Sequence, residues 1–475
     1  MILERFTFER LQTTLLFLAI ATAACLMPAQ HDTWWLLRAG HDMWGAGHVL
    51  LTDTFSHTVD GAFWPNHEWL SELLFYGIYA IGGLPLLTLA SALVVTSAWA
   101  IVWTETPGPV RVKFLLTALV VASASTTWSL RAQVLSLLLV TVTMALLRRR
   151  RYGWLPVVFW CWANLHGAVL IGLLLLGAAL AAALIEKIEA VPRLLLVTAL
   201  CLVATSLTPL GWNFWLDMPR SLGRIRQLGI DEWAPPRLTS RSLLPFWMTL
   251  ATLAALAVTR GRALWRDPIA RREGRITMCA CALVLVPLAL TAVRNVPPFL
   301  MLALRAIAAL LPTVTAVTPS RSAPHPWVNC GIACAAAVVA AIVVTSAYAS
   351  RAGRFHWTPL PAASIAALDG CHGNLYNRYD EGGYLIWFAP GRKVFLDGRQ
   401  DPYPPSLIKE QARVESNGDF EDLFARYDVG CAYLPSTSRL TAGLLRSGWT
   451  PLFQDSGWTV LARDLQGGDY VARRR

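Results

Sequence analysis

Apolar stretches of roughly 15–20 residues recur along most of the chain, with short polar segments between them. An α-helix of about 20 apolar residues crosses the hydrocarbon core of a bilayer, and a shorter helix can cross when it packs inside a bundle. The pattern therefore predicts an α-helical polytopic membrane protein with about eleven spans. The predicted segments are 11–27, 84–103, 114–130, 132–147, 153–165, 168–185, 194–208, 244–259, 276–292, 296–311 and 327–349.

After residue 350 the pattern changes to charged sequence with Gly, Pro and short alternating runs. These runs predict a soluble C-terminal α/β domain over residues 351–475, which follows a membrane module over residues 1–350. Helical spacing is visible at residues 405–427. The strands predicted for this domain are 384–388, 393–396, 429–434 and 459–462.

Basic residues cluster at 111–113, 148–151 and 260–275, in short segments between the apolar ones. Cytoplasmic loops hold such an excess of Lys and Arg, so these clusters and the N-terminus are predicted to be cytoplasmic. The first outer loop, residues 29–70, and the C-terminal domain are then predicted to lie on the outer side of the membrane. Because the first outer loop and residues 111–113 lie on opposite sides of the membrane, an odd number of spans separates them. Segment 84–103 supplies one span, so residues 69–81 are predicted to form a helix that lies on the outer surface or dips into it. The alternative is that residues 69–81 form a further span.

Composition agrees with a membrane protein: 15% of residues are charged and the mean hydropathy is +0.46, whereas soluble domains have about 25% charged residues. The net charge of +11 is explained by membrane orientation, so a nucleic-acid partner is not expected. Seven of the nine Cys lie in apolar segments. Cys371 and Cys431 lie in polar sequence, where they can pair if the compartment is oxidising.

The first outer loop contains an unusual number of residues of the types that occur in catalytic and metal-binding sites. Five of the chain's nine His lie in it, with five acidic residues and five Trp. A connector this long without regular structure is usually functional or disordered, and the aromatic content argues against disorder. We therefore interpret residues 30–70 as the active-site loop of a membrane enzyme.

Three residues of this loop are candidate catalytic groups: Asp32, His67 and Glu68. Asp32 follows the first span directly, where a carboxylate can accept a proton or, together with Asp53, hold Mg²⁺ or Mn²⁺. The alternative is that Asp32 caps the next helical turn. Glu68 likewise can serve as the acid in the first turn of the helix that follows it.

Two arginines at predicted outer helix ends, Arg131 and Arg294, are candidate ligands for the phosphate of a lipid-linked donor. Guanidinium groups bind phosphate oxygens in pairs, and an Arg at this depth is costly without an anion. Snorkelling to lipid headgroups is the alternative for both.

Five further polar residues are candidate substrate-binding groups, by virtue of their outer-side positions. For Asn164 and His166 the alternative is helix packing, and for Glu232 it is a solvated turn before two prolines. Asp397 ends a predicted strand before Gly398, a place typical both of binding residues and of hairpin turns. The five candidates are Asn164, His166, Glu232, Asp397 and Arg399.

Six short motifs together resemble a group of bacterial polytopic proteins placed with the GT-C superfamily of glycosyltransferases. The motifs are D-x-W-W-x-x-R-x-G from Asp32, D-T-F-S from Asp53, H-E-W-L from His67, N-L-H-G from Asn164, E-W-x-P from Glu232 and R-N-x-P from Arg294. The resemblance implies a polyprenyl-phosphate sugar donor, action on the periplasmic or luminal face, and a base or metal-binding acid at Asp32.

Residues 379–399 also resemble the oligosaccharyltransferase catalytic subunit, in which a Trp/Asp/Tyr/Gly motif precedes a strand and a second Asp. This chain has Tyr-Asp-Glu-Gly-Gly-Tyr at residues 379–384 in place of the tryptophan-rich form. Protein N-glycosylation is therefore not implied by the resemblance.

These observations favour an inverting glycosyl transfer from a lipid-linked sugar to a glycan, lipid or protein acceptor. A transporter is the first alternative, but it predicts polar groups near the bilayer midplane and repeated broken helices. The second alternative is a non-catalytic scaffold of the cell envelope whose C-terminal domain binds partners.

Overall fold

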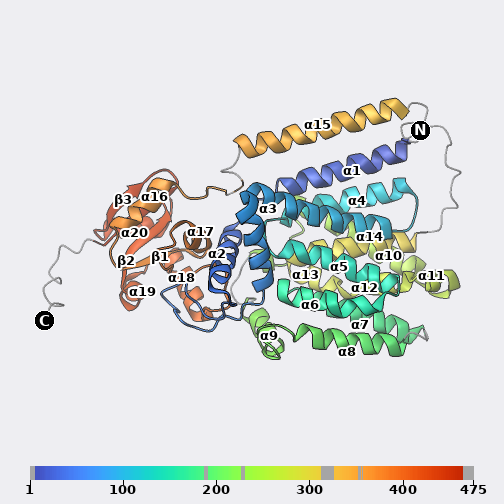
Figure 1. Ribbon diagram of the computed structural model, residues 1–475, viewed down its shortest axis with the longest axis horizontal. Coiled ribbons are helices and arrows are strands. Elements are labelled where there is room, and N and C mark those ends of the chain that lie inside the picture. The colour runs from blue at the N-terminus through green and yellow to red at the C-terminus, as the bar shows by residue number, and fades with distance from the viewer. Residues whose placement is uncertain are drawn as a thin grey trace. The chain divides into compact units, whose positions relative to one another are not determined.

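The computed structural model describes residues 6–186, 191–225, 231–311, 326–350, 355 and 357–463. The chain divides into two compact units (Figure 1). The helical unit comprises Met1–Pro28, Ile78–Trp215 and Gly229–Phe355, and the α/β unit comprises Ala29–Gly77, Leu216–Leu228 and His356–Arg475. The first outer loop is thus grouped with the C-terminal segment rather than with the apolar helices.

All eleven apolar segments are helical, which confirms the predicted class of α-helical membrane protein with a smaller α/β part. One of them, 276–292, is divided before Pro287, which has no backbone N–H to continue a helix. The helices are α1 (Phe8–Cys25), α3 (Trp69–Glu105), α4 (Val110–Ala124), α5 (Gln133–Arg148), α6 (Leu155–Leu165), α7 (Val169–Ile185), α8 (Val191–Thr205), α9 (Asn213–Ile225), α10 (Leu244–Arg266), α11 (Pro268–Arg272), α12 (Arg275–Val284), α13 (Val286–Thr291), α14 (Val296–Leu310) and α15 (Pro326–Ser350).

Five helical stretches in the described part of the chain are long and apolar enough to cross a membrane: Trp69–Glu105, Val110–Thr127, Arg241–Arg266, Val293–Leu310 and Pro326–Ala349. Their burial differs strongly. All fifteen residues of α14 are buried, so α14 is a central helix of the helical unit. Helix α15 lies beside α1 (Figure 1) and is mostly exposed. An apolar helix with so little protein around it is suited to contact lipid.

Residues 69–81 are helical, as predicted, but they belong to the same helix as the apolar segment 84–103. This helix, α3, contains a kink at Gly82 and Gly83, where Gly83 has φ 61°. Only glycine adopts that backbone conformation readily, and Pro85 follows immediately.

The α/β unit contains a four-stranded sheet in the order β1-β2-β4-β3, in which β1 and β2 are parallel and the other pairs are antiparallel. The strands are β1 (Asn374–Asn377), β2 (Val429–Pro435), β3 (Thr450–Gln454) and β4 (Trp458–Ala462), and the helices are α2 (His31–Ala46), α16 (Ala362–Ala366), α17 (Tyr379–Phe388), α18 (Pro405–Asn417), α19 (Glu421–Arg426) and α20 (Arg439–Arg446). The predictions of strands at 429–434 and 459–462 and of helix within 405–427 are confirmed.

Three local predictions are wrong. Residues 31–46 of the supposedly irregular loop form helix α2, with a capping box between Gln30 and Thr33. Residues 384–388 belong to helix α17 rather than to a strand. Residues 393–396 form no strand, and Val394 makes only an isolated bridge with Ser56. Strands β1 and β3 were not predicted.

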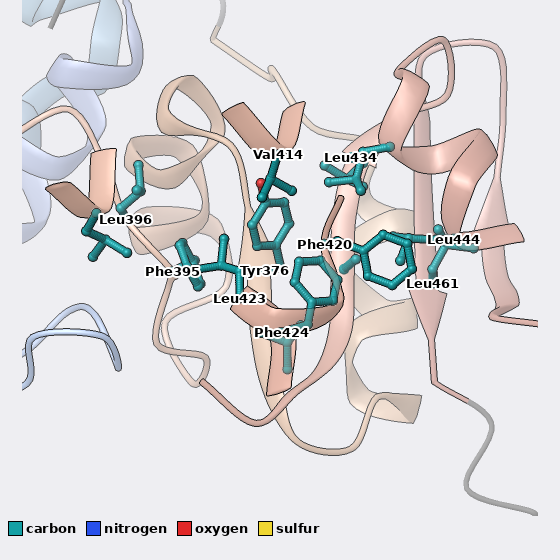
Figure 2. Close-up of a cluster of buried hydrophobic side chains, with 14 of the residues drawn as sticks. Tyr376, Phe395, Leu396, Val414, Phe420, Leu423, Phe424, Leu434, Leu444 and Leu461 are labelled. Carbon is teal, nitrogen blue, oxygen red and sulfur yellow. The ribbon is translucent and has the colours of Figure 1, made fainter. Parts of the chain in front are cut away.

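One core of the α/β unit is aromatic. Tyr376 of β1 and Phe424 of α19 have ring centroids 4.7 Å apart, and Phe395 lies 4.9 Å from Tyr376 (Figure 2). Leucines from α19, β2, α20 and β4 complete this cluster. The segment that contains Phe395 and Leu396 is therefore anchored in the core without being a strand, which fixes the start of the 397–399 segment.

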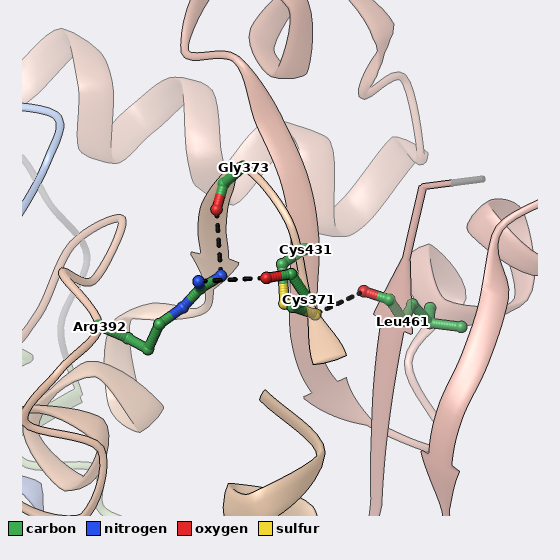
Figure 3. Close-up of a disulfide and its surroundings, with 5 residues drawn as sticks. All are labelled: Cys371, Gly373, Arg392, Cys431 and Leu461. Carbon is green, nitrogen blue, oxygen red and sulfur yellow. Dashed lines mark hydrogen bonds between the residues drawn. A yellow bond between two sulfur atoms is a disulfide. The ribbon is translucent and has the colours of Figure 1, made fainter. Parts of the chain in front are cut away.

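Cys371 and Cys431, whose pairing the sequence left open, form a disulfide with a Cα–Cα distance of 5.5 Å (Figure 3). The bond joins the residues before β1 to β2. Arg392 donates hydrogen bonds to the carbonyl oxygens of Cys371 and Gly373, at 3.3 and 3.0 Å.

Helix α2 is held by neighbours that approach its backbone closely. A Cβ added at Gly383 of α17 would lie 2.2 Å from the carbonyl oxygen of His31, and one added at Gly40 would lie 2.2 Å from that of Glu72. Both glycines are therefore required by the packing rather than by a special backbone conformation. Gly383 packs against the first turn of α2, and Gly40 lets the middle of α2 approach Glu72 of α3.

Gly383→Ala should therefore destabilise the α/β unit by about 1–3 kcal/mol, because the new methyl group meets rigid backbone. Thermal unfolding of the purified protein would measure the loss. Gly443→Ala in α20 is the matched control, since no atom lies within 4 Å of its added Cβ, and it should be neutral or stabilising by up to about 1 kcal/mol. Equal melting temperatures for the Gly383 variant and the parent would contradict the close approach.

Candidate active site

Asp32 lies in the first turn of α2, and 7% of the residue is exposed. Its Oδ1 accepts a hydrogen bond from Nε1 of Trp35 at 2.9 Å and lies 3.2 Å from Nε2 of His31. The alternative that Asp32 caps this helix is wrong, because the N-cap is Gln30 and Asp32 lies inside the first turn. The positive end of the helix dipole nevertheless favours a carboxylate at this position.

The 397–399 segment meets Asp32 directly. A Cβ added at Gly398 would lie 2.5 Å from Oδ1 of Asp32, and the Tyr379 hydroxyl donates to the Gly398 carbonyl at 3.1 Å. Tyr379 and Tyr384 also place their rings edge-on to His31, at centroid distances of 6.1 and 6.4 Å. The structure thus brings together two motifs from opposite ends of the chain.

Burial raises the pKa of Tyr384 above its usual range, and the charges of Asp380, Glu381 and Asp32 raise it further. Tyr384 therefore remains a neutral phenol at physiological pH and retains its hydroxyl proton as a hydrogen-bond donor.

Arg399 is the centre of a fully buried ion cluster. Its Nη2 lies 2.5 Å from Oδ1 of Asp53 and 2.7 Å from Oδ2 of Asp397, and its Nε donates to Oδ1 of Asp397 at 2.8 Å. The hydroxyl of Tyr403 donates to Oδ2 of Asp397 at 2.5 Å. The guanidinium also lies over the ring of Trp64, 4.7 Å from its centroid.

The charged groups in this cluster keep one another ionised. Burial by itself would raise the pKa of Asp397, but the Arg399 guanidinium and the hydrogen bonds outweigh it and hold that pKa below its usual range. Burial alone would lower the pKa of Arg399. The neighbouring Asp397, Tyr403 and Asp53 raise this pKa by more, so the pKa of Arg399 lies well above its usual range. Both groups are charged, and the cluster fastens residues 53–64 to residues 397–403.

Asp53 and Asp32 were predicted as tentative metal ligands. The oxygens of Asp53 accept hydrogen bonds from Ser56 Oγ at 2.6 Å and from backbone N–H groups, besides the contact with Arg399. Over the described residues, no group of three or more His, Cys, Asp or Glu is placed to hold a metal ion. Asp32 and Asp53 therefore belong to no such group among these residues, and we assign no reaction step to a metal.

His67 and Glu68 lie at the start of α3 beside a residue that sequence reasoning missed, Asp401. Nδ1 of His67 lies 3.8 Å from Asp401 and its Nε2 lies 3.7 Å from Glu68, while the Ser221 hydroxyl donates to Asp401. Asp401 follows the D-G-R motif by two residues, but nothing local marks it as a partner of His67.

Glu72 was also missed. It is fully buried, its Oε2 accepts a hydrogen bond from Nδ2 of Asn66 at 2.8 Å, and its Oε1 has no hydrogen-bond partner among the described residues. An acid within an apolar helix is rare and usually functional, which is the signal that could have identified it.

In the helical unit, three of the predicted residues meet. Arg131 binds Glu232 through both terminal nitrogens, at 2.8 and 3.2 Å, and Nη1 of Arg294 lies 3.1 Å from Oε1 of the same carboxylate. The Arg294 guanidinium also lies 4.3 Å from the ring centroid of Trp233. Glu232 belongs to a 3₁₀ turn, Asp231–Trp233, and Arg294 to another, Val293–Asn295.

Asn164 and His166 lie at the C-terminal end of α6. Nδ2 of Asn164 donates to the carbonyl oxygens of Trp160 and Leu207, at 2.8 and 3.2 Å. Nδ1 of His166 lies 2.7 Å from Oγ of Ser136, and that oxygen accepts from Nε1 of Trp162 at 2.8 Å. These contacts join α5, α6 and the residues after α8.

No protein-family model matches this chain, and no curated protein matches it in sequence. Solved structures do match its fold. The archaeal oligosaccharyltransferase AglB from Archaeoglobus fulgidus, in complex with an inhibitory peptide and a dolichol-phosphate, has a TM-score of 0.56 at 11% identity, over 89% of this chain and 69% of that one. ArnT from Cupriavidus metallidurans, bound to undecaprenyl phosphate, has a TM-score of 0.52 at 14% identity, over 94% of this chain and 97% of that one.

A second structure of the A. fulgidus oligosaccharyltransferase, tethered to an acceptor peptide that contains the NVT sequon, has a TM-score of 0.53 at 12% identity and covers 89% of this chain. These similarities extend over both units. The chain therefore has a GT-C-like fold, and the predicted resemblance to that superfamily is confirmed at the level of fold.

Arg399→Ala should destabilise the protein by about 3–5 kcal/mol, because it leaves two buried carboxylates without their cation. Arg399→Lys should restore little, since one ammonium cannot replace the guanidinium fork. Thermal unfolding would measure both. The control is Arg426→Ala, whose exposed pair with Glu410 should contribute little to stability, because solvent screens it.

The lowered pKa of Asp397 also determines how the stability of the protein depends on pH. A carboxyl whose folded pKa is depressed contributes its full stabilisation above the ordinary Asp pKa of about 3.9, and loses it as the pH falls further. Unfolding scans of the parent should therefore fall in melting temperature below about pH 4, and this acid-sensitive part should be missing in Arg399→Ala. A parent protein with no acid sensitivity would argue against the charged cluster.

Proposed function

We propose that this chain is a membrane glycosyltransferase that transfers a sugar from a polyprenyl-phosphate-type lipid donor to an acceptor outside the cytoplasm. The observation on which the proposal rests is the convergence of Arg131 and Arg294 on one carboxylate, within a GT-C-like fold. The acceptor class, whether glycan, lipid or protein, is left to experiment.

The arginine pair suits the donor side of the reaction. Arg131 presents its two terminal nitrogens to two oxygens of Glu232, and phosphate oxygens accept the same fork. With one carboxylate between two guanidinium groups, the cluster has a net positive charge. Fixed cations of this kind stabilise the charge that develops on a leaving phosphate. We assign Arg131 and Arg294 to the donor phosphate, and Glu232 to holding the two arginines or a sugar hydroxyl.

Asp32 suits the acceptor side. We assign it as the base that takes the proton of the attacking acceptor group, while the new bond forms at the anomeric carbon. The bond from that carbon to the phosphate oxygen breaks, and the lipid phosphate leaves with the electron pair, which inverts the configuration. His31 and Trp35 hold the carboxylate in place. His67 and Glu68, beside Asp401, are proposed to assist in proton transfer.

The remaining predicted residues receive roles that their contacts support. Asp397 binds Arg399 and Tyr403, and Arg399 also binds Asp53. We therefore assign Asp397 and Arg399 to holding Gly398 against Asp32. Asn164 and His166 are proposed to bind substrate or to shape its site. The two roles of His166 can be distinguished by substitution, because only the loss of a substrate contact would change KM.

The proposed location is the periplasmic side of a bacterial inner membrane. The disulfide between Cys371 and Cys431 supports this, because disulfides persist in oxidising compartments. The basic clusters at residues 148–151 and 260–275 support a cytoplasmic location for the opposite helix ends.

Asp32→Asn should lower donor turnover about 10²-fold or more, because the amide retains the size of Asp32 but cannot accept the proton. The assay offers purified protein a panel of polyprenyl-phosphate and polyprenyl-pyrophosphate sugars, with and without Mg²⁺ or Mn²⁺, and measures release of the lipid phosphate. The control is Asp60→Asn in the same loop, where an exposed Asp pairs with Lys393. Full activity of the Asp32 variant would eliminate this residue as the base, and activity only with a metal would reinstate a metal site.

Arg294→Gln should raise the KM for the lipid donor at least about tenfold, which corresponds to the loss of one charge-assisted contact. Arg294→Lys should recover only part of this, because an ammonium lacks the fork. The control is Arg260→Gln, an exposed residue of the basic segment. An unchanged KM in the Arg294 variants, with donor turnover intact, would assign this arginine to structure alone.

A further inference from the structure

A second feature of the helical unit is a cavity of about 430 Å³ among α7, α10, α12 and α14. Its size falls in the range of about 300–1,000 Å³ typical of small-molecule sites. None of its lining residues is charged. They are Ala178, Ala181, Ala182, Ile185, Leu253, Ala257, Gly261, Leu264, Trp265, Ile276, Cys279, Ala280, Leu283 and Leu310.

Small side chains account for the cavity. Half of the lining residues are Ala, Gly or Cys, so the four helices approach one another without filling the space between them. A space of this size lined by hydrocarbon loses dispersion contacts on every wall unless something apolar occupies it. In a bilayer, the hydrocarbon chain of a lipid is the most abundant apolar filler.

A cation is held beside the cavity. Nε and Nη2 of Arg271 donate to the carbonyl oxygen of Trp265, at 3.0 and 2.7 Å, and the guanidinium lies 5.9 Å from the Trp265 ring centroid. Trp265 itself lines the cavity. A Trp with an adjacent Arg is typical of the level at which lipid headgroups lie.

The surrounding segment is strongly basic. Residues 260–275 contain six Arg and two acidic residues. Both acidic side chains are engaged locally: Asp267 accepts a hydrogen bond from the backbone N–H of Ile269, and Glu273 pairs with Arg275. Glu186, at the C-terminal end of α7, also interacts electrostatically with Arg271 and Arg150. The six arginines of residues 260–275 still outnumber these three acidic residues, so the charge of the segment favours an anionic headgroup.

This cavity is separate from the arginines assigned to the donor phosphate. Leu310, at the C-terminal end of α14, lines the cavity, whereas Arg294 precedes the N-terminus of the same helix. The fourteen steps from Val296 to Leu310 span about 20 Å at 1.5 Å per residue. One lipid phosphate cannot lie at both places.

From these observations we propose that the cavity binds one chain of an anionic phospholipid, whose headgroup lies against Arg271 in the leaflet on the basic side of the protein. This site is distinct from the proposed donor site and does not depend on the proposed activity. The occupant is a phospholipid rather than the polyprenyl donor, because the headgroup cation lies at the other end of α14 from Arg131 and Arg294.

The test is lipid binding to the delipidated full-length protein in detergent, measured by native mass spectrometry. The probes are phosphatidylglycerol, phosphatidylcholine with the same chains, and undecaprenyl phosphate. The parent should retain one phosphatidylglycerol at concentrations at least tenfold lower than phosphatidylcholine. Arg271→Gln should remove that preference and leave phosphatidylcholine binding unchanged.

Gly261→Leu should fill the cavity and weaken phosphatidylglycerol binding at least tenfold. No atom lies within 4 Å of the Cβ added at Gly261, so the variant is expected to fold, and its melting temperature checks this. Gly177→Leu on α7 is the matched control, because its added Cβ is equally unobstructed and Gly177 does not line the cavity.

Two outcomes would overturn the proposal. One is phosphatidylglycerol binding in both the Gly261→Leu and Arg271→Gln variants as tight as in the parent. The other is displacement of phosphatidylglycerol by undecaprenyl phosphate at equal concentration, with the same dependence on Gly261, which would make the cavity a polyprenyl site. Neither outcome bears on Asp32 or Arg294, whose roles are tested by turnover.

Discussion

The buried guanidinium of Arg399 is the interaction on which the α/β unit depends. It joins Asp53, from the first outer loop, to Asp397, from the C-terminal segment, with no exposure to solvent. Without it, Asp53 and Asp397 would be buried carboxylates that repel each other, and residues 53–64 would be held by other contacts alone, such as the hydrogen bonds of His57 and Thr58 to backbone carbonyl groups. Because Gly398 lies between the two charged residues of the C-terminal segment and against Asp32, the same interaction determines what surrounds the proposed base.

The helical unit also holds charged side chains in apolar surroundings. Arg131 and Arg294 are separated along the chain but share Glu232, so neither guanidinium is left without an anion. The cavity near Arg271 and the arginine pair occupy opposite ends of α14. Under the two proposals made above, the unit offers two different environments to lipid phosphates, one with convergent guanidinium groups and one with an apolar chain site beside a single held cation.

The apolar helices were predictable because uninterrupted runs of apolar residues can be recognised locally, and all eleven segments are helical. The strand prediction at residues 384–388 was wrong because a short apolar run, Tyr-Leu-Ile-Trp-Phe, fits a buried helix and a buried strand equally well. Helix α2 was missed because its polar and glycine-containing sequence has weak helical spacing, and its stability comes from packing against Gly383 and its own Gly40. Local propensity could not reveal either contact.

The sequence by itself determined the class of protein, the places where polar residues interrupt apolar helices, and the candidate residues Asp32, Arg131, Glu232, Arg294, Asp397 and Arg399. Hydrophobic length and charge distribution are local properties, and they can be read without knowing any contact. Only the tertiary structure decided that Asp53 belongs to Arg399, that Asp401 lies beside His67, and that the two arginines share Glu232. Those pairings join residues far apart in sequence, and they are chosen by the free energy of burying charges together, which depends on the whole fold.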